Sequence, residues 1–262
     1  MIVYLVLGLI QGLTEFLPVS SSGHLVPAER LFGLQPPGLV CEAALHLATL
    51  CAVLVAFRHD LVELIRAFGA RGSLDRRKEI GLLILGTVPI VILGLVLRGS
   101  ADVWFRSLWV VGAGWLATAA MVACADRRAR GAAAIPSAAG AFSIGLAQAV
   151  ALVPGVSRSG FSIGAGLLVG LRPDRAARFS FLLSIPAVAG AGALVLWDAV
   201  HVPAGEALDI PGVAVAAGVA FVVGLLALRA LLALVVRRRL WPFAAYCAAL
   251  GGVALTLAAI WR

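Results

Sequence analysis

The feature that most constrains this chain is a series of apolar runs, each close to the roughly 20 residues that a helix needs to cross a bilayer. Of its 262 residues, 62% are apolar and 13% are charged, whereas soluble domains carry roughly 25% charged residues. Lipid must therefore surround most of the chain. The sequence predicts an all-α polytopic membrane protein that forms a single domain over 1–262.

Hydropathy predicts six transmembrane helices, at about 40–57, 80–97, 107–125, 177–197, 211–236 and 241–261. Two further apolar stretches, 1–34 and 138–171, are interrupted by the sequences PVSSSGH and PGVSRSG. Irregular backbone at membrane depth is tolerated only where it faces protein or a water-filled cavity. We therefore expect two re-entrant helix–loop–helix hairpins. The opening run lacks a basic leader region and a cleavage pattern, so we expect mature protein rather than a signal peptide.

Basic residues predict the orientation of the spans, because Lys and Arg in short loops collect on the cytoplasmic side. The segments rich in Arg or Lys are 58–79, 126–130, 172–178 and 237–239. The loops 98–106 and 198–210 are poor in positive charge. We expect the first set inside and the second outside. The net charge of +8 then reflects topology and attraction to anionic lipid, and it requires no nucleic acid.

The chain resembles itself, without gaps, at an offset of 137 residues. The matches are Gly8-Leu9 with Gly145-Leu146, Gln11 with Gln148, Val19-Ser20 with Val156-Ser157, and Ser22-Gly23 with Ser159-Gly160. Each copy, about 1–126 and about 138–262, holds one hairpin and three spans, so the second copy enters the membrane from the opposite side. Such inverted repeats build sites where their broken segments meet. The alternative is chance similarity between two Gly-, Ser- and Pro-rich segments.

Two charged residues lie inside the interrupted segments, Glu15 in the first and Arg158 in the second. A charge at the centre of a membrane helix costs about 2.5–3.5 kcal/mol, so both are candidates for function. The alternative is a structural ion pair that joins the hairpins. Gln11 precedes Glu15 by four residues, which places both on one helix face.

The residue types around these charges suit the transfer of a phosphoryl group. Arginine is a planar, permanently charged fork for phosphate oxygens, and hydroxyl and loop N–H groups add donors. The predicted phosphate-binding residues are Ser20, Ser22, Gly23, Ser157, Arg158, Ser159 and Gly160. The predicted catalytic residues are Glu15, Ser21, His24 and Arg158, with Ser21 and His24 both open as the nucleophile.

Gln11 and Glu15 are the predicted ligands of a divalent cation, Mg²⁺ or Ca²⁺. The other histidines, His46, His59 and His201, are expected to be structural or interfacial. The four cysteines lie singly in apolar runs without metal-binding spacing, and are expected to be small buried side chains.

Two segments, QGLTEFLPVSSSGH (11–24) and PGVSRSG (154–160), closely resemble the signature motifs of the undecaprenyl pyrophosphate phosphatase family of the bacitracin-resistance type. The resemblance extends to the length, the hydropathy profile and the duplicated hairpins. It implies a homodimeric six-span enzyme of the bacterial inner membrane, with two re-entrant hairpins and a site open to the outer face. It also implies catalytic and phosphate-binding roles for Glu15, Ser21, His24 and Arg158, with Mg²⁺ or Ca²⁺ as helper ion.

The chain departs from the family pattern in two places. Many members carry Glu where this chain has Gln11, which weakens the case for two carboxylates on one metal ion. Phe161-Ser162 stands where a Thr-containing tail often follows the arginine motif.

The resemblance implies hydrolysis of undecaprenyl diphosphate to undecaprenyl phosphate and inorganic phosphate at the outer face. This activity would recycle the lipid carrier for cell-wall synthesis and confer bacitracin resistance. Type-2 phosphatidic acid phosphatases are a poorer match, because the chain has neither a Lys-x6-Arg-Pro nor a His-x3-Asp sequence. A transporter or flippase of the same lipid is the other alternative, since inverted repeats with broken helices are common in transporters. The length of the polyprenyl chain and the oligomeric state stay open.

Overall fold

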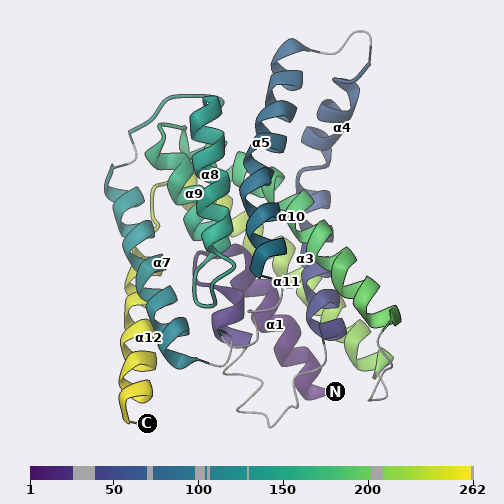
Figure 1. The fold of residues 1–262 in the computed structure, drawn as a ribbon, viewed down its shortest axis with the longest axis vertical. Helices are drawn as coiled ribbons and strands as arrows, with labels where there is room; N and C mark the ends of the chain where they lie inside the picture. Colours follow the sequence, from purple (N-terminus) through teal and green to yellow (C-terminus); the bar gives the residue numbers. More distant parts are fainter. Residues whose placement is uncertain are drawn as a thin grey trace.

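The computed structural model describes residues 1–25, 39–69, 73–97, 104, 107–128, 130–201 and 209–260, and most of them are helical (Figure 1). The named helices are α1 (Ile2–Phe16), α3 (Leu39–Ala56), α4 (Arg58–Arg66), α5 (Leu74–Leu97), α7 (Leu108–Arg128), α8 (Ala138–Val150), α9 (Arg158–Leu168), α10 (Pro173–His201), α11 (Ile210–Val236) and α12 (Trp241–Ile260).

Five helical segments are long and apolar enough to cross a membrane: Leu74–Leu97, Leu108–Arg128, Pro173–Val195, Ile210–Val236 and Trp241–Ile260. Val40–Ala56 and Arg58–Arg66, which meet at an angle of 72°, add a sixth if they count as one bent span. The predicted multi-pass membrane protein is thereby confirmed. Helices α1 and α8 have 15 and 13 residues, too few to cross alone at 1.5 Å per residue.

The short helices α1 and α8 end where proline follows. Leu17, the C-cap of α1, is extended at φ −62° and ψ 145°, the conformation favoured before a proline such as Pro18. Ser20 then has a φ of 70°, and residues 21–25 form a short helix. After α8 the chain turns through Pro154 and begins α9 at Arg158. Each interrupted segment is thus a helix, a turn and a second helix.

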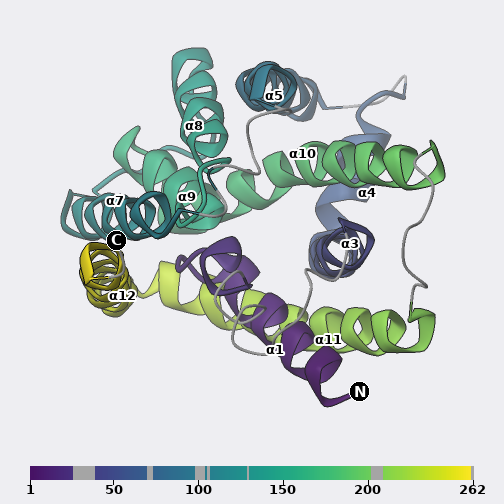
Figure 2. The same ribbon diagram turned by 60° about the horizontal axis from the view of Figure 1, so that its bottom comes forward.

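Each short helix packs along one of the long ones, α1 on α11 and α8 on α5, while α7 pairs with α12 (Figure 2). Two glycines allow these close approaches. A Cβ on Gly8 would lie 2.5 Å from the carbonyl oxygen of Ala216, and one on Gly145 would lie 2.0 Å from that of Gly86. Small residues at helix crossings let backbones approach in this way.

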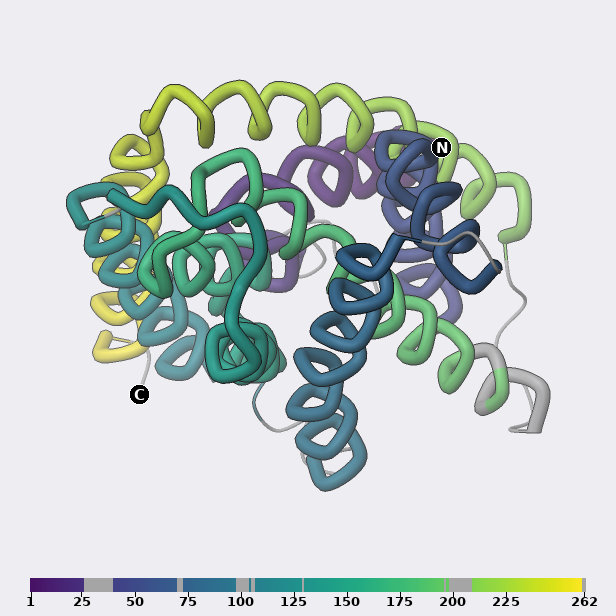
Figure 3. The backbone as a smooth tube through the Cα atoms, turned by 90° about the horizontal axis from the view of Figure 1, so that it is seen from above, coloured from purple at the N-terminus to yellow at the C-terminus, as the bar shows by residue number. Residues whose placement is uncertain are grey.

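Helices α3 and α10 complete the bundle. Seen from above, α10 lies between α11 and α5 (Figure 3), and α3 packs against both α10 and α11. Phe16, at the end of α1, is buried, and its ring meets that of Phe181 edge-on at 5.8 Å. This packing fixes the end of α1, where the functional residues lie.

Candidate active site

The two interrupted segments meet through an ion pair between Glu15, in the last turn of α1, and Arg158, the first residue of α9. Arg158 Nη2 donates to Glu15 Oε1. The Glu15 and Arg158 side chains are 7% and 16% exposed, so the pair is largely withdrawn from solvent. Breaking such a buried pair costs several kcal/mol, because one charge is left uncompensated. The pair therefore holds the tips of the two segments together.

Ser21 is the hydroxyl that contacts this carboxylate. Its Oγ donates to Glu15 Oε2 across 2.7 Å. A carboxylate within hydrogen-bond reach of a hydroxyl is positioned to accept its proton when that hydroxyl attacks an electrophile. Ser21 and Glu15 thus have the geometry of a nucleophile and its base.

His24 lies beside this pair, but its two ring nitrogens are engaged elsewhere. Nδ1 lies 2.7 Å from the carbonyl oxygen of Ser20, and Nε2 lies 2.8 Å from the hydroxyl of Tyr246 on α12. A carbonyl oxygen can only accept, so Nδ1 carries the proton. The imidazole also stacks on the Tyr246 ring and meets the Trp115 ring edge-on. Sequence reasoning missed Tyr246, which is distant in sequence and belongs to neither motif.

Two of the predicted phosphate-binding serines act as helix caps. Ser20 Oγ accepts from the backbone N–H of Gly23 at 3.3 Å, and Ser157 Oγ accepts from that of Gly160 at 3.1 Å. A cap of this kind satisfies a backbone donor that has no partner within the helix. These serines fix the loops that carry Ser21 and Arg158, and direct contact with phosphate stays a prediction for them.

The other predicted loop residues lie close by. The Ser22 hydroxyl is 3.3 Å from that of Ser20, and the Ser159 hydroxyl is 3.2 Å from that of Ser157 and donates to the carbonyl oxygen of Leu17. Gly23 lies against Trp115, where a Cβ would be 2.9 Å from the indole ring. The structure therefore brings all the predicted phosphate-binding residues to the junction of the two segments.

His46 of α3, which was expected to be structural or interfacial, contacts the predicted metal ligands Gln11 and Glu15. Gln11 Nε2 donates to Glu15 Oε2 at 3.2 Å and lies 3.1 Å from His46 Nδ1. His46 Nδ1 is itself 3.5 Å from Glu15 Oε2. An ionisable residue inside an apolar span is a signal of function in its own right, and that signal was present in the sequence.

A family model described as "Bacitracin resistance protein BacA" matches residues 4–253. The chain belongs to this family. Curated relatives named "Undecaprenyl-diphosphatase" include one from Desulfosudis oleivorans, 45% identical over 95% of this chain and 96% of the relative. One from Nocardioides sp. is 43% identical over 97% and 95%, and one from Mycobacterium leprae is 42% identical over 97% and 93%. The match covers both interrupted segments and the helices around them.

Gln11 and Glu15 offer oxygen atoms, which are the ligands that fit a divalent cation of the kind that the resemblance implies. Gln11 Oε1 is buried and has no hydrogen-bond partner, and it belongs to the same amide that contacts the carboxylate. Mg²⁺ is commonly held by one or two carboxylates together with phosphate oxygens of the substrate. Within the described part of the chain, no group of three or more His, Cys, Asp and Glu side chains could hold a metal. The substrate would therefore have to complete the coordination.

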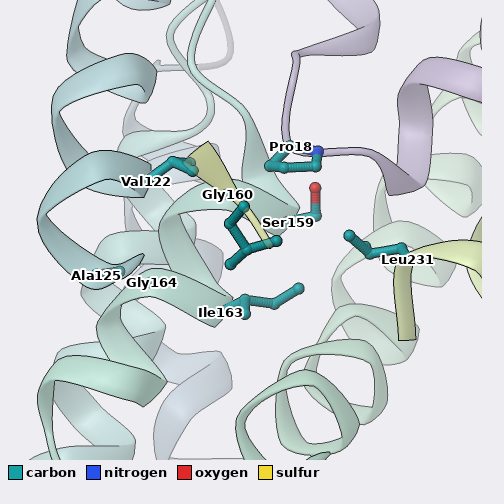
Figure 4. A pocket seen from close by; sticks show the side chains of 9 residues that line it. Pro18, Val122, Ala125, Ser159, Gly160, Ile163, Gly164 and Leu231 are labelled. Atoms are coloured by element: carbon teal, nitrogen blue, oxygen red, sulfur yellow. The ribbon is translucent and has the colours of Figure 1, made fainter. Parts of the chain in front are cut away.

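Arg158 keeps a second donor available, because its Nη1 is buried without a hydrogen-bond partner. A pocket next to the start of α9 is lined by Pro18, Ser159, Ile163 and Leu231 among others (Figure 4). The volume open to the centre of a water molecule is about 10 Å³, enough for one water at most. This pocket is too small for a lipid headgroup.

Proposed function

We propose that this protein is an undecaprenyl-diphosphatase, which hydrolyses undecaprenyl diphosphate to undecaprenyl phosphate and inorganic phosphate. The activity recycles the lipid carrier of cell-wall synthesis and confers resistance to bacitracin. One observation carries the proposal within the site. The hydroxyl of Ser21 donates to a buried carboxylate, Glu15, whose other oxygen is paired with Arg158. A nucleophile (Ser21), a base (Glu15) and a phosphate-binding arginine (Arg158) thus lie together in a membrane protein of the bacitracin-resistance family.

In the first step, Ser21 Oγ attacks the terminal phosphorus and its proton passes to Glu15. The Oγ–P bond forms as the bond from phosphorus to the bridging oxygen breaks, and undecaprenyl phosphate leaves with that oxygen. Arg158 binds the non-bridging oxygens through Nη1 and stabilises the charge on the transferring group. The structure favours Ser21 over His24 as nucleophile, because both ring nitrogens of His24 contact other groups.

In the second step, water attacks the phosphoserine. The new O–P bond forms as the Oγ–P bond breaks, Ser21 regains a proton by way of Glu15, and inorganic phosphate is released. His24 is held with its proton on Nδ1 by the Ser20 carbonyl, so its Nε2 accepts a hydrogen bond from the Tyr246 hydroxyl. A divalent cation held by Gln11 Oε1 and Glu15 would screen the charge of the diphosphate.

The polyprenyl chain stays in the bilayer during the reaction. Each buried CH₂ contributes about 0.8 kcal/mol, so a long polyprenyl chain cannot leave the membrane. The diphosphate must therefore meet the site at the membrane surface, by lateral approach. The charge bias of the loops favours the outer surface for this encounter.

We also propose that the two copies, about 1–126 and about 138–262, form an inverted repeat with two re-entrant hairpins. Hydrogen bonds at the offset of 137 residues support it. Ser20, Ser22 and Gly23 form the same pair of contacts as Ser157, Ser159 and Gly160. The packing also corresponds, because α1 lies on the second span of the other copy, α11, and α8 lies on α5.

Phosphate release by the purified protein in detergent tests the proposed function. Undecaprenyl diphosphate should yield inorganic phosphate, and Ser21→Ala should abolish the release, whereas Ser143→Ala, on the exposed side of α8, should not. Detergent provides no second membrane side, so a flippase without hydrolytic activity would release nothing. The absence of phosphate release by the wild-type protein would exclude the proposed function. The homodimer implied by the resemblance stays a prediction, which cross-linking in native membranes would test.

A further inference from the structure

His46 is a polar residue of the site to which neither motif assigns a role. It lies on α3, outside both interrupted segments, yet its Nδ1 is 3.1 Å from Gln11 Nε2. Gln11 is completely buried, so each of its two amide ends must be matched to a neighbour or leave a polar atom unsatisfied. His46 is the neighbour of the nitrogen end.

The chemistry of the contact determines the role of His46. An amide nitrogen only donates, so His46 Nδ1 is the acceptor in this contact. The two N–H groups of Gln11 Nε2 then go to His46 Nδ1 and to Glu15 Oε2. The oxygen of the same amide, Oε1, is left buried and unpaired. His46 and Glu15 together hold the nitrogen end of the amide, so the oxygen end stays available.

The second copy of the repeat offers a comparison inside the same chain. Gln148 corresponds to Gln11, and its Nε2 donates to the backbone carbonyl of Leu183, the residue that corresponds to His46. The amide nitrogen thus contacts the corresponding residue in both copies, a side chain in the first and a backbone carbonyl in the second. The second copy has Leu152, Phe161 and Leu183 where the first has Glu15, His24 and His46. His46 therefore occurs in the copy that carries Glu15 and His24, and an apolar residue replaces it in the copy where those two are also replaced.

We propose that His46 is a positioning residue that orients the Gln11 amide so that Oε1, and not Nε2, is presented to the divalent cation. The two ends of an amide have nearly the same shape and opposite hydrogen-bonding character. Without an acceptor at His46 Nδ1, Glu15 Oε2 is the acceptor that remains for the nitrogen end, so the amide is held less firmly. An amide that turns presents a donor where a cation needs a lone pair. This inference rests on the proposed function for the identity of the substrate, but not for the binding of the cation.

Three substitutions separate orientation from packing. His46→Asn places an oxygen near the position of Nδ1 and should keep cation binding within about twofold of wild type. His46→Gln carries its polar atoms one bond further out, near the position of Nε2, and His46→Leu carries none. Both should weaken Ca²⁺ binding about tenfold, a loss of about 1.4 kcal/mol. Binding is measured by isothermal titration calorimetry without substrate, after a thermal melt has shown that each variant is folded.

The Gln11→Glu background provides the decisive control. A carboxylate has two equivalent oxygens, so it needs no orientation, and His46→Leu should change Ca²⁺ affinity less than threefold there. A tenfold loss in both backgrounds would show that His46 acts through packing and would overturn the proposal. Equal affinities for His46→Asn and His46→Gln would overturn it as well. The proposed function fails separately, if wild-type protein that binds Ca²⁺ releases no phosphate from undecaprenyl diphosphate.

Discussion

The carboxylate of Glu15 is held by three donors. Arg158 pairs with one oxygen, and Ser21 and Gln11 donate to the other. A carboxylate surrounded in this way is kept ionised and fixed in direction, both of which a general base requires. In the proposed mechanism Glu15 combines the roles of base, ion-pair partner and cation ligand, and the first prediction separates them.

Glu15→Gln should lower phosphate release by at least about 10²-fold, because general base catalysis contributes about 10²–10⁴-fold. The loss should persist at every Mg²⁺ concentration, since an amide cannot accept the Ser21 proton. The rate is measured against Mg²⁺ and Ca²⁺ for wild type and variant. Rescue by added metal would instead assign Glu15 to cation binding alone.

Gln11→Glu supplies a second carboxylate one helical turn from Glu15. It should be tolerated, and it should lower the Mg²⁺ concentration needed for half-maximal rate, because an added anion strengthens the binding of a nearby divalent cation. The same metal titration measures it. An unchanged metal dependence would mean that Gln11 and Glu15 do not share an ion.

Arg158→Lys keeps the charge but loses the planar fork. One terminal nitrogen of the arginine pairs with Glu15 and the other is free for phosphate, whereas an ammonium is a single point donor. We expect the rate of phosphate release to fall at least about tenfold, or about 1.4 kcal/mol in activation free energy. Arg172→Lys, in an exposed pair with Asp174, is the matched control. Near-wild-type turnover of Arg158→Lys would exclude the proposed binding of phosphate oxygens by the arginine fork.

At the scale of helices, backbone contact sets the position of the interrupted segments. Gly145 of α8 lies so near Gly86 of α5 that an added Cβ would be 2.0 Å from a carbonyl oxygen, while Gly94 of the same α5 has nothing within 4 Å of its Cβ position. A backbone oxygen cannot move aside as the end of a flexible side chain can. The α5–α8 contact therefore tolerates no side chain at Gly145.

Gly145→Ala should destabilise the protein by about 1–3 kcal/mol, the usual cost of overpacking. Gly94→Ala should be neutral or slightly stabilising, because alanine favours helix. Thermal melts of both variants in one detergent measure the difference. Equal melting temperatures would contradict the close α5–α8 contact.

A second ionic cluster joins α4, α5 and α10 away from the catalytic pair. Arg178 donates to Asp60 and Glu79, and Arg76 donates to Glu79 and Glu63. The Glu79 side chain is only 3% exposed. Removing a partner from a buried pair costs about 3–5 kcal/mol, so this cluster should contribute far more to stability than the exposed Arg172–Asp174 pair.

Arg178→Gln should therefore lower the melting temperature strongly, and Arg172→Gln should hardly change it, since an exposed ion pair contributes about 0–1 kcal/mol. Both substitutions remove one positive charge from the same segment. Melting curves of the two variants test the prediction. A similar melting temperature for both would show that the buried cluster is not stabilising.

At the scale of the whole molecule, the sequence predicted features that depend on local residues, and it did not predict the long-range packing of the helices. Pro18 predicts the end of α1, and apolar runs of sufficient length predict the spans, because both depend on neighbours in the sequence. The arrival of His46 and Tyr246 at the site depends on how α3 and α12 pack, which no local pattern encodes. The bend between α3 and α4, and the extension of α5 to Leu74 through charged residues, were missed for the same reason.

The orientation of the whole molecule follows from charge and gives the last prediction. The segments 58–79 and 126–130 carry the basic residues, and 198–210 carries none, so 58–79 should lie inside and 198–210 outside. Ile210, at the start of α11, and Phe68, after α4, are 68% and 76% exposed. In a background without the four native cysteines, Ile210→Cys should react with an impermeant thiol reagent in intact cells, and Phe68→Cys should react only after lysis. Because α1 starts at the same end of the molecule as α11 in Figure 1, this pattern would place the first hairpin on the outer side. Labelling of Phe68→Cys alone would place it on the cytoplasmic side, where an enzyme that meets the diphosphate at the outer surface could not reach its substrate.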